Sequence, residues 1–251
     1  MSRLQGYYQY PFIFMTACKW AFPMSQAKFE LFEQSLDNLF NWLENKDVSR
    51  GHFVSKNQIN PELLTTLKRS LGYQLTPVIV ANSLDLIIDI YPTVAVGAAK
   101  TGILHVGRYN WLNLRDQNKQ QDILGSLQKC FPEIDVLSLG KLDHEKLPTV
   151  PSTDMREVSP LIPLDGVDEF INTHEQIILT FDLSSLSKGV GLLEEKALDK
   201  EVKELIERCT ATDKVRMILL TGDSDRSLYS RKTKAIYDGL KDVSHRQLQH
   251  A

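Results

Sequence analysis

The 251-residue chain lacks the features that mark membrane proteins and disulfide-bonded domains. It has no run of about 18 apolar residues, the length that a helix needs to cross a bilayer. Its three cysteines lie far apart, at Cys18, Cys130 and Cys209, with no CxxC or Cys/His metal spacing. We therefore expect reduced thiols and a cytoplasmic protein that does not contact a membrane.

A charge excess of one sign is also missing. The chain has 29 Lys and Arg against 32 Asp and Glu, a formal net charge of −3, and no long basic run. This balance excludes binding to nucleic acid through bulk positive charge. The GxGxxG, P-loop, GxSxG and HExxH motifs are absent from the sequence, so it gives no support for nucleotide binding or for the common hydrolase mechanisms.

The aromatic stretch YPFIFMTACKWAF (10–22) is the one N-terminal segment that raises the question of a signal peptide. Lys19 interrupts it, few charges precede it, and it has no clean small-residue cleavage site. We interpret it as a buried first strand with its exit loop. The segment GYYQYPF (6–12) is a candidate contact surface for another protein or a second copy, although burial as an edge strand is the competing expectation.

Short apolar runs alternate with segments of helical periodicity along the whole chain. The runs expected to be strands are 11–17, 76–83, 93–99, 101–107, 134–140, 176–183 and 214–222. The expected helices are 25–45, 61–72, a segment that stops before Pro92, 117–131, 166–174, 194–210 and 226–243, with a long loop at 141–165. This alternation predicts one three-layer α/β/α domain over residues 1–251, with a mainly parallel sheet.

Ligands of such sheets bind at the carboxyl ends of the strands, so the residues after each strand are the ones to inspect. Asp182 follows the run ILTF, and Ser184, Ser185 and Ser187 come soon after it. Asp182 has two interpretations: a structural acid that accepts hydrogen bonds, or an acid that recognises a cation. His105 lies inside an apolar strand, and we expect a hydrogen-bonded core histidine rather than a catalytic base.

The strand ends resemble, in pattern and order, those of the ureohydrolases, the family of arginase, agmatinase and formimidoylglutamase. That family carries GGDHS, DAHxD and SFDxDxxDP signatures after three strands, and these hold two manganese ions. Here PVIV (77–80), ILHV (103–106) and TFDLSSLSKG (180–189) occupy the same places, and the tail from 223 is similar. The resemblance covers residues ~70–245 and implies an arginase-like fold.

Carried over residue by residue, the resemblance places almost no ligand atoms at the manganese positions. The histidine of the first signature falls on Leu84, and the first acid of the third signature falls on Asp182. The remaining positions of the second and third signatures fall on Gly107, Tyr109, Trp111, Ser184 and Ser187. One carboxylate cannot hold two dications, so the resemblance implies a chain without the family's manganese ions and without another cofactor.

We therefore expect a catalytically inactive arginase-like protein with a binding, scaffold or regulatory role. A protein partner, self-association and a small-molecule ligand are its expected interactions. The alternative is a hydrolase of a C–N bond in a guanidino or other nitrogen-rich small molecule, using Asp182 with Asp85, Asp223 or Asp225. A third interpretation is another doubly wound protein, unrelated to the ureohydrolases.

No residue is assigned a catalytic role, and Asp182 is the vestigial candidate. The side chains that could line a pocket at the strand ends are Ser83, Arg108, Tyr109, Trp111, Ser184 and Ser187. Large aromatic side chains at former ligand positions could instead fill the space by packing, and we favour filling over binding.

Overall fold

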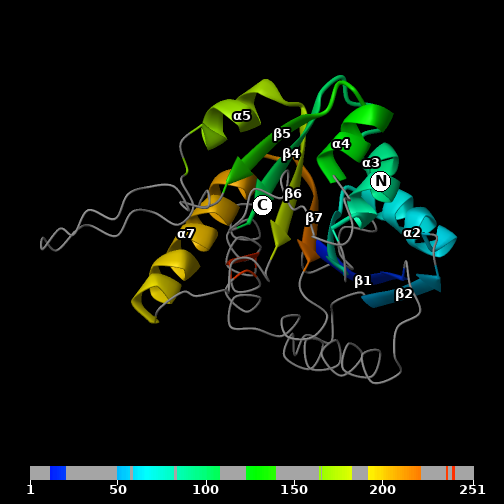
Figure 1. Ribbon diagram of the computed structural model, residues 1–251, viewed down its shortest axis with the longest axis horizontal. Coiled ribbons are helices and arrows are strands. Elements are labelled where there is room, and N and C mark those ends of the chain that lie inside the picture. The colour runs from blue at the N-terminus through cyan, green and yellow to red at the C-terminus, as the bar shows by residue number, and fades with distance from the viewer. Residues whose placement is uncertain are drawn as a thin grey trace, which may run out of the picture.

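A computed structural model describes the chain in segments (Figure 1). The described residues are 12–20, 50–56, 59–81, 84–107, 123–139, 164, 166–182, 192–221, 236 and 239–240. The predicted helix 25–45, all of the predicted loop 141–165 except residue 164, and most of the predicted helix 226–243 lie outside these segments.

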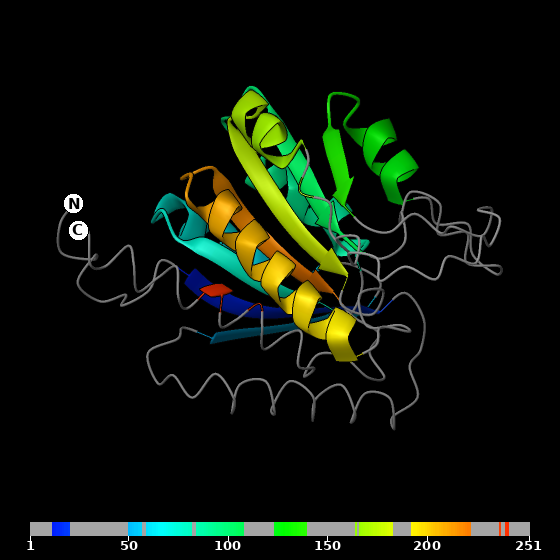
Figure 2. The same cartoon turned by 90° about the vertical axis from the view of Figure 1, so that its left-hand side faces the viewer.

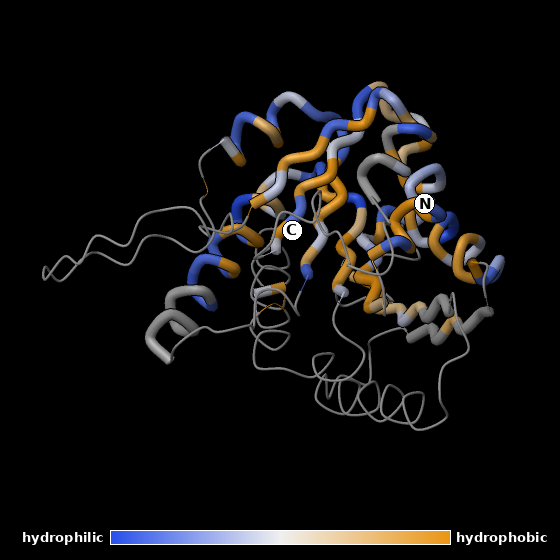
Figure 3. The backbone as a smooth tube through the Cα atoms, in the orientation of Figure 1, coloured by the Kyte–Doolittle hydropathy of each residue, from blue (hydrophilic) through white to orange (hydrophobic). Residues whose placement is uncertain are grey.

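The described strands form a seven-stranded sheet in which every recorded pair of neighbours is parallel. The strand order is β2-β1-β3-β7-β6-β4-β5. The strands are β1 (Phe12–Trp20), β2 (Arg50–Lys56), β3 (Thr76–Ala81), β4 (Thr101–Val106), β5 (Asp135–Leu139), β6 (Gln176–Asp182) and β7 (Val215–Thr221). Central strands are buried on both faces, which explains their continuous apolar sequences (Figure 3).

Helices cover both faces of this sheet and give three layers. The described helices are α2 (Pro61–Gly72), α3 (Leu86–Val94), α4 (Ile123–Cys130), α5 (Val167–Thr173) and α7 (Leu192–Thr210). Buried residues of α2, α3 and α4 form one core with one face of the sheet. Those of α5 and α7 form a second core with the other face, and Figure 2 shows α7 lying across it. The three-layer α/β/α architecture predicted from the sequence is confirmed.

Two predictions at the C-terminal end of α3 are wrong. The helix does not stop before Pro92 but continues to Val94. Proline removes only one hydrogen bond so near the helix end, and the last turn is held by the amide of Ala95 donating to Tyr91 at 2.9 Å and by the burial of Val94. Residues 93–99 are therefore not a strand; they end the helix and turn at Gly97, whose φ of +84° suits glycine.

Strand β2 was missing from the sequence prediction. Its sequence, RGHFVSK, has only Phe53 and Val54 as large apolar residues and no clear alternation. An edge strand has a neighbour on one side only, here β1, so it needs less apolar sequence than a central strand. Local pattern alone therefore could not identify β2.

Candidate functional site at the carboxyl edge of the sheet

The four central strands end together at one edge of the sheet. Ala81 at the end of β3 is paired with Thr221 at the end of β7, and Thr221 is paired in turn with Asp182 at the end of β6. On the next strand, Val106 is paired with Phe181, so Gly107 follows at the level of Asp182. These ends are the predicted place for a ligand in a parallel α/β sheet.

These terminal residues share the face of the sheet that α2, α3 and α4 cover. Ala81 belongs to the core on that face. Side chains alternate along a strand, so Thr221 lies on the same face as Leu219, and Asp182 on the same face as Ile178. The edge is thus a row of small or polar side chains at the end of an apolar core.

Asp182 is the one carboxylate among the described residues that end these four strands. It is half-buried. Its strand neighbour Thr221 is buried, and the Thr221 hydroxyl donates to the carbonyl of Phe181 at 3.1 Å. The hydroxyl beside Asp182 is therefore used to fasten β7 to β6, which is a structural role.

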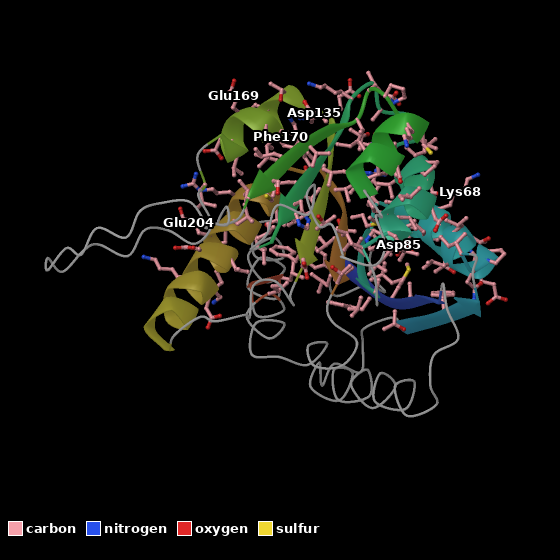
Figure 4. All side chains as sticks on the ribbon, viewed as in Figure 1. Lys68, Asp85, Asp135, Glu169, Phe170 and Glu204 are labelled. Carbon is pink, nitrogen blue, oxygen red and sulfur yellow. The ribbon has the colours of Figure 1, made fainter. Side chains whose placement is uncertain are left out.

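The segment after β3 continues into α3. Leu84, which stands where the resemblance places a histidine, is half-buried and packs against the core under α2 and α3. Asp85, an acid of the alternative enzyme hypothesis, lies at the N-cap of α3 and is labelled in Figure 4. Asp223 and Asp225, the other two acids of that hypothesis, lie outside the described residues.

Gly107 stands where the resemblance places an aspartate. The residue is buried, and its amide donates to the carbonyl of Leu139 at 3.0 Å, which extends the pairing of β4 with β5. Glycine offers no side-chain ligand atom, and its amide is already used by the sheet. This position therefore contributes to the fold and cannot hold a metal ion through a side chain.

A buried polar pair lies on the same face of the sheet, two residues before Gly107, which follows β4, and two residues before Asp182 on β6. The Nδ1 atom of His105 lies 2.8 Å from the Thr180 hydroxyl, and both side chains are fully buried. Desolvation lowers the pKa of His105 from 6.5 to about 3, so the ring is neutral at physiological pH. The expectation of a hydrogen-bonded core histidine is confirmed. Sequence reasoning did not find its partner, because only the register of β4 against β6 brings Thr180 beside it.

The predicted pocket-lining residues are not among those that the structure describes. They are Ser83, Arg108, Tyr109, Trp111, Ser184 and Ser187. Whether the aromatic residues fill the edge or line a pocket stays a prediction.

The described side chains do not fit a pair of manganese ions. Within the described segments, no three His, Cys, Asp or Glu side chains are grouped closely enough to hold a metal ion. At the positions given by the resemblance, Leu84 is used in packing and Gly107 has no side chain, which leaves Asp182 as the one carboxylate. Divalent manganese requires several carboxylate or imidazole ligands.

Comparison with known proteins identifies the fold. No protein-family model matches the chain, and no curated protein matches it in sequence. Solved structures do match. Formimidoylglutamase from Bacillus subtilis gives a TM-score of 0.57 at 12% identity over 94% of this chain and 88% of that one. The chain has an arginase-like fold.

Two arginases extend this similarity over nearly their whole length. The Entamoeba histolytica enzyme gives a TM-score of 0.56 at 12% identity, covering 94% of this chain and 98% of that one. The Bacillus cereus enzyme gives 0.54 at 10% identity, covering 92% and 97%. Among the described helices of this arginase-like chain, none is long and apolar enough to cross a membrane.

Proposed function

We propose that this arginase-like protein is catalytically inactive as a ureohydrolase and acts by binding, as a scaffold or regulatory protein. The observation that carries the proposal is the use of Leu84 for packing and of Gly107 for strand pairing, at two positions where the resemblance requires metal ligands. In the family, the two manganese ions supply the activated water that attacks the substrate. A chain that keeps one of the ligand acids lacks the charge to hold that pair of ions.

The retained fold supports a role for the surface rather than for the strand-end chemistry. Among the described residues, the core under α2, α3 and α4 has residues from all seven strands, and the core under α5 and α7 has residues from every strand except β2. The polar groups His105, Thr180 and Thr221 are engaged in hydrogen bonds within the sheet. We propose that the partner is another protein or a second copy of this chain, with a small molecule as a further candidate ligand. The free thiols of Cys130 and Cys209 agree with a reducing, cytoplasmic location.

The decisive experiment is a metal analysis of the purified chain. The protein is prepared with added Mn²⁺, desalted, and its manganese content per chain is measured by plasma mass spectrometry. Formimidoylglutamase from Bacillus subtilis, treated in parallel, is the matched control for the procedure. We expect no stoichiometric manganese in the chain and no hydrolysis of guanidino compounds by the same preparation.

Two tightly bound manganese ions per chain would overturn the proposal and favour the alternative, a hydrolase of a C–N bond in a nitrogen-rich small molecule. An Asp182→Asn variant shows where any such ions bind. If that variant lost the metal, Asp182 would be a ligand; if it kept the metal, the ions would bind away from the strand ends. Light scattering of the same sample measures whether the chain associates with itself.

A further inference from the structure

His174 lies at the opposite edge of the sheet from the candidate site, between α5 and β5. It is the C-cap residue of α5, and Glu175 alone separates it from the first residue of β6. Its side chain is completely buried. Figure 4 labels Asp135 on β5 and Phe170 on α5, the two elements that the histidine joins.

The hydrogen bond at Nδ1 fixes the position of one proton. Nδ1 lies 2.6 Å from the carbonyl oxygen of Phe170. The Thr173 hydroxyl donates to the same carbonyl at 3.0 Å and lies 3.2 Å from Nδ1. A carbonyl oxygen only accepts, so the short contact requires that Nδ1 of His174 carries a hydrogen.

The other ring nitrogen faces a carboxylate. Nε2 of His174 lies 3.4 Å from Oδ2 of Asp135, within ion-pair distance but outside hydrogen-bond geometry. Nε2 has no hydrogen-bond partner within the part of the chain that the structure describes. If the ring were neutral, with its hydrogen on Nδ1, a buried lone pair would face a negative oxygen. A second proton on Nε2 turns this repulsion into an ion pair.

Two more features on α5 favour the charged ring. The C-terminal end of a helix carries partial negative charge and stabilises a cation there. The Phe170 ring lies over the imidazole with centroids 4.2 Å apart and an interplanar angle of 37°, which suits a cation–π contact. Gly102 on β4 makes room for both rings, since a Cβ at that position would lie 2.7 Å from Phe170 and 2.8 Å from His174.

Some of the charged groups around His174 favour a positive ring and others disfavour it. Lys214, which precedes β7, donates to the carbonyls of Ile171 and Asn172 and adds positive charge at the same helix end. Lys100, which precedes β4, pairs with Asp135 at 3.5 Å and competes for its carboxylate. Glu175 is adjacent in the chain and accepts from the amide of Ala99 at 2.9 Å.

We propose that His174 is a proton-dependent latch that holds α5 on β4 and β5, closed when both ring nitrogens carry a hydrogen and weakened when one is lost. Closure buries Val167 and Ile171 of α5 in the core of that face. Loss of the proton from Nε2 restores the unfavourable contact with Asp135 and loosens this helix in particular.

Amide hydrogen exchange of α5, measured by NMR from about pH 5 to about pH 8, tests the latch. After correction for intrinsic exchange, protection of α5 should fall about fivefold as pH rises, the size expected for a part-exposed ion pair. His174→Gln and Asp135→Asn should each remove this pH dependence. Lys100→Gln is the matched control: it takes a charge from the same carboxylate and should leave the dependence in place.

The ¹⁵N shifts of the His174 ring give an independent readout that does not depend on the variants folding. At the acidic end both nitrogens should show the protonated signature, and Nε2 should lose it in step with the loss of α5 protection. An unprotonated Nε2 with α5 fully protected would overturn the proposal. Equal pH dependence of α5 in the wild type and in the Asp135→Asn variant would overturn it as well.

Discussion

His105 on β4 and Thr180 on β6 are paired in register, and the His105 Nδ1 atom lies 2.8 Å from the Thr180 hydroxyl in the fully buried interior. The pair places two polar groups close to the strand ends, one residue before the end of β4 and two before the end of β6, on the face covered by α2, α3 and α4. Burial excludes the water that would solvate a charged imidazole, and this lowers the pKa of His105 to about 3.

The first prediction concerns stability in acid. The pKa of His105 is about 3 in the folded chain and 6.5 in an unfolded one, so between these values the unfolded state binds more protons. The contribution of His105 to stability is therefore fully present above pH 6.5 and is lost as pH falls toward 3, by up to about 1.4 kcal/mol per pH unit.

Urea unfolding of the wild type and of His105→Gln over a pH series measures the pH-dependent contribution of His105 to the free energy of unfolding. Glutamine does not titrate, so the difference in free energy of unfolding between the two proteins should shrink as pH falls from about 7 to about 5. A constant difference would contradict the neutral, buried histidine. The stabilisation by His105 is lost as pH falls, whereas protection of α5 by the His174 latch is lost as pH rises. The opposite directions separate the two effects.

The second prediction concerns the Thr180 hydroxyl. Thr180→Val keeps the shape of the side chain but removes the hydroxyl beside the buried His105 ring, and should lower the free energy of unfolding by about 1–3 kcal/mol. Thr180→Ser keeps the hydroxyl and loses a methyl group, and should cost less. Chemical denaturation measures whether Thr180→Val loses more free energy of unfolding than Thr180→Ser. A Thr180→Val variant as stable as the wild type, or more stable, would show that the hydroxyl is not needed.

The third prediction compares two glycines. Gly102→Ala would place a methyl group 2.7 Å from the Phe170 ring, and should destabilise the fold by about 1–3 kcal/mol through forced repacking of α5. Gly72→Ala at the end of α2 meets no atom within 4 Å, and should stabilise by about 0.4–1 kcal/mol because it restricts the unfolded chain. Thermal unfolding should show a lower Tm for Gly102→Ala and a higher Tm for Gly72→Ala than for the wild type. Equal changes in Tm would contradict the close contact at Gly102.

The fourth prediction concerns manganese and thermal stability. A metal that binds only the folded state at a thousandfold excess over its Kd stabilises it by about 4 kcal/mol. We expect the Tm of the wild type to be the same in Mn²⁺ and in chelator, and the same for Asp182→Asn. A rise of Tm with Mn²⁺ that disappears in Asp182→Asn would contradict the proposed loss of the metal centre.

The layers and most elements could be predicted from sequence because their signals are local. The helix at Pro61–Gly72 begins with a capping asparagine and proline and ends at glycine, and its bounds match the prediction. Strands β4, β6 and β7 are buried on both faces and have continuous apolar sequences. Strand β2 and the end of α3 were not predictable in this way, since pairing with β1 and burial of Val94 decided them.

For the candidate site, the sequence by itself determined which atoms are available: Leu84 and Gly107 offer no side-chain ligand, and Asp182 offers one carboxylate. Only the tertiary structure decided what those residues do instead, because packing and strand pairing join segments far apart in the chain. In the folded chain Leu84 packs in the core and the Gly107 amide bonds to β5. His105 lies within hydrogen-bond distance of Thr180, and His174 lies within ion-pair distance of Asp135. The sequence specifies which polar side chains are present, whereas the register of the parallel strands determines which of them lie in contact.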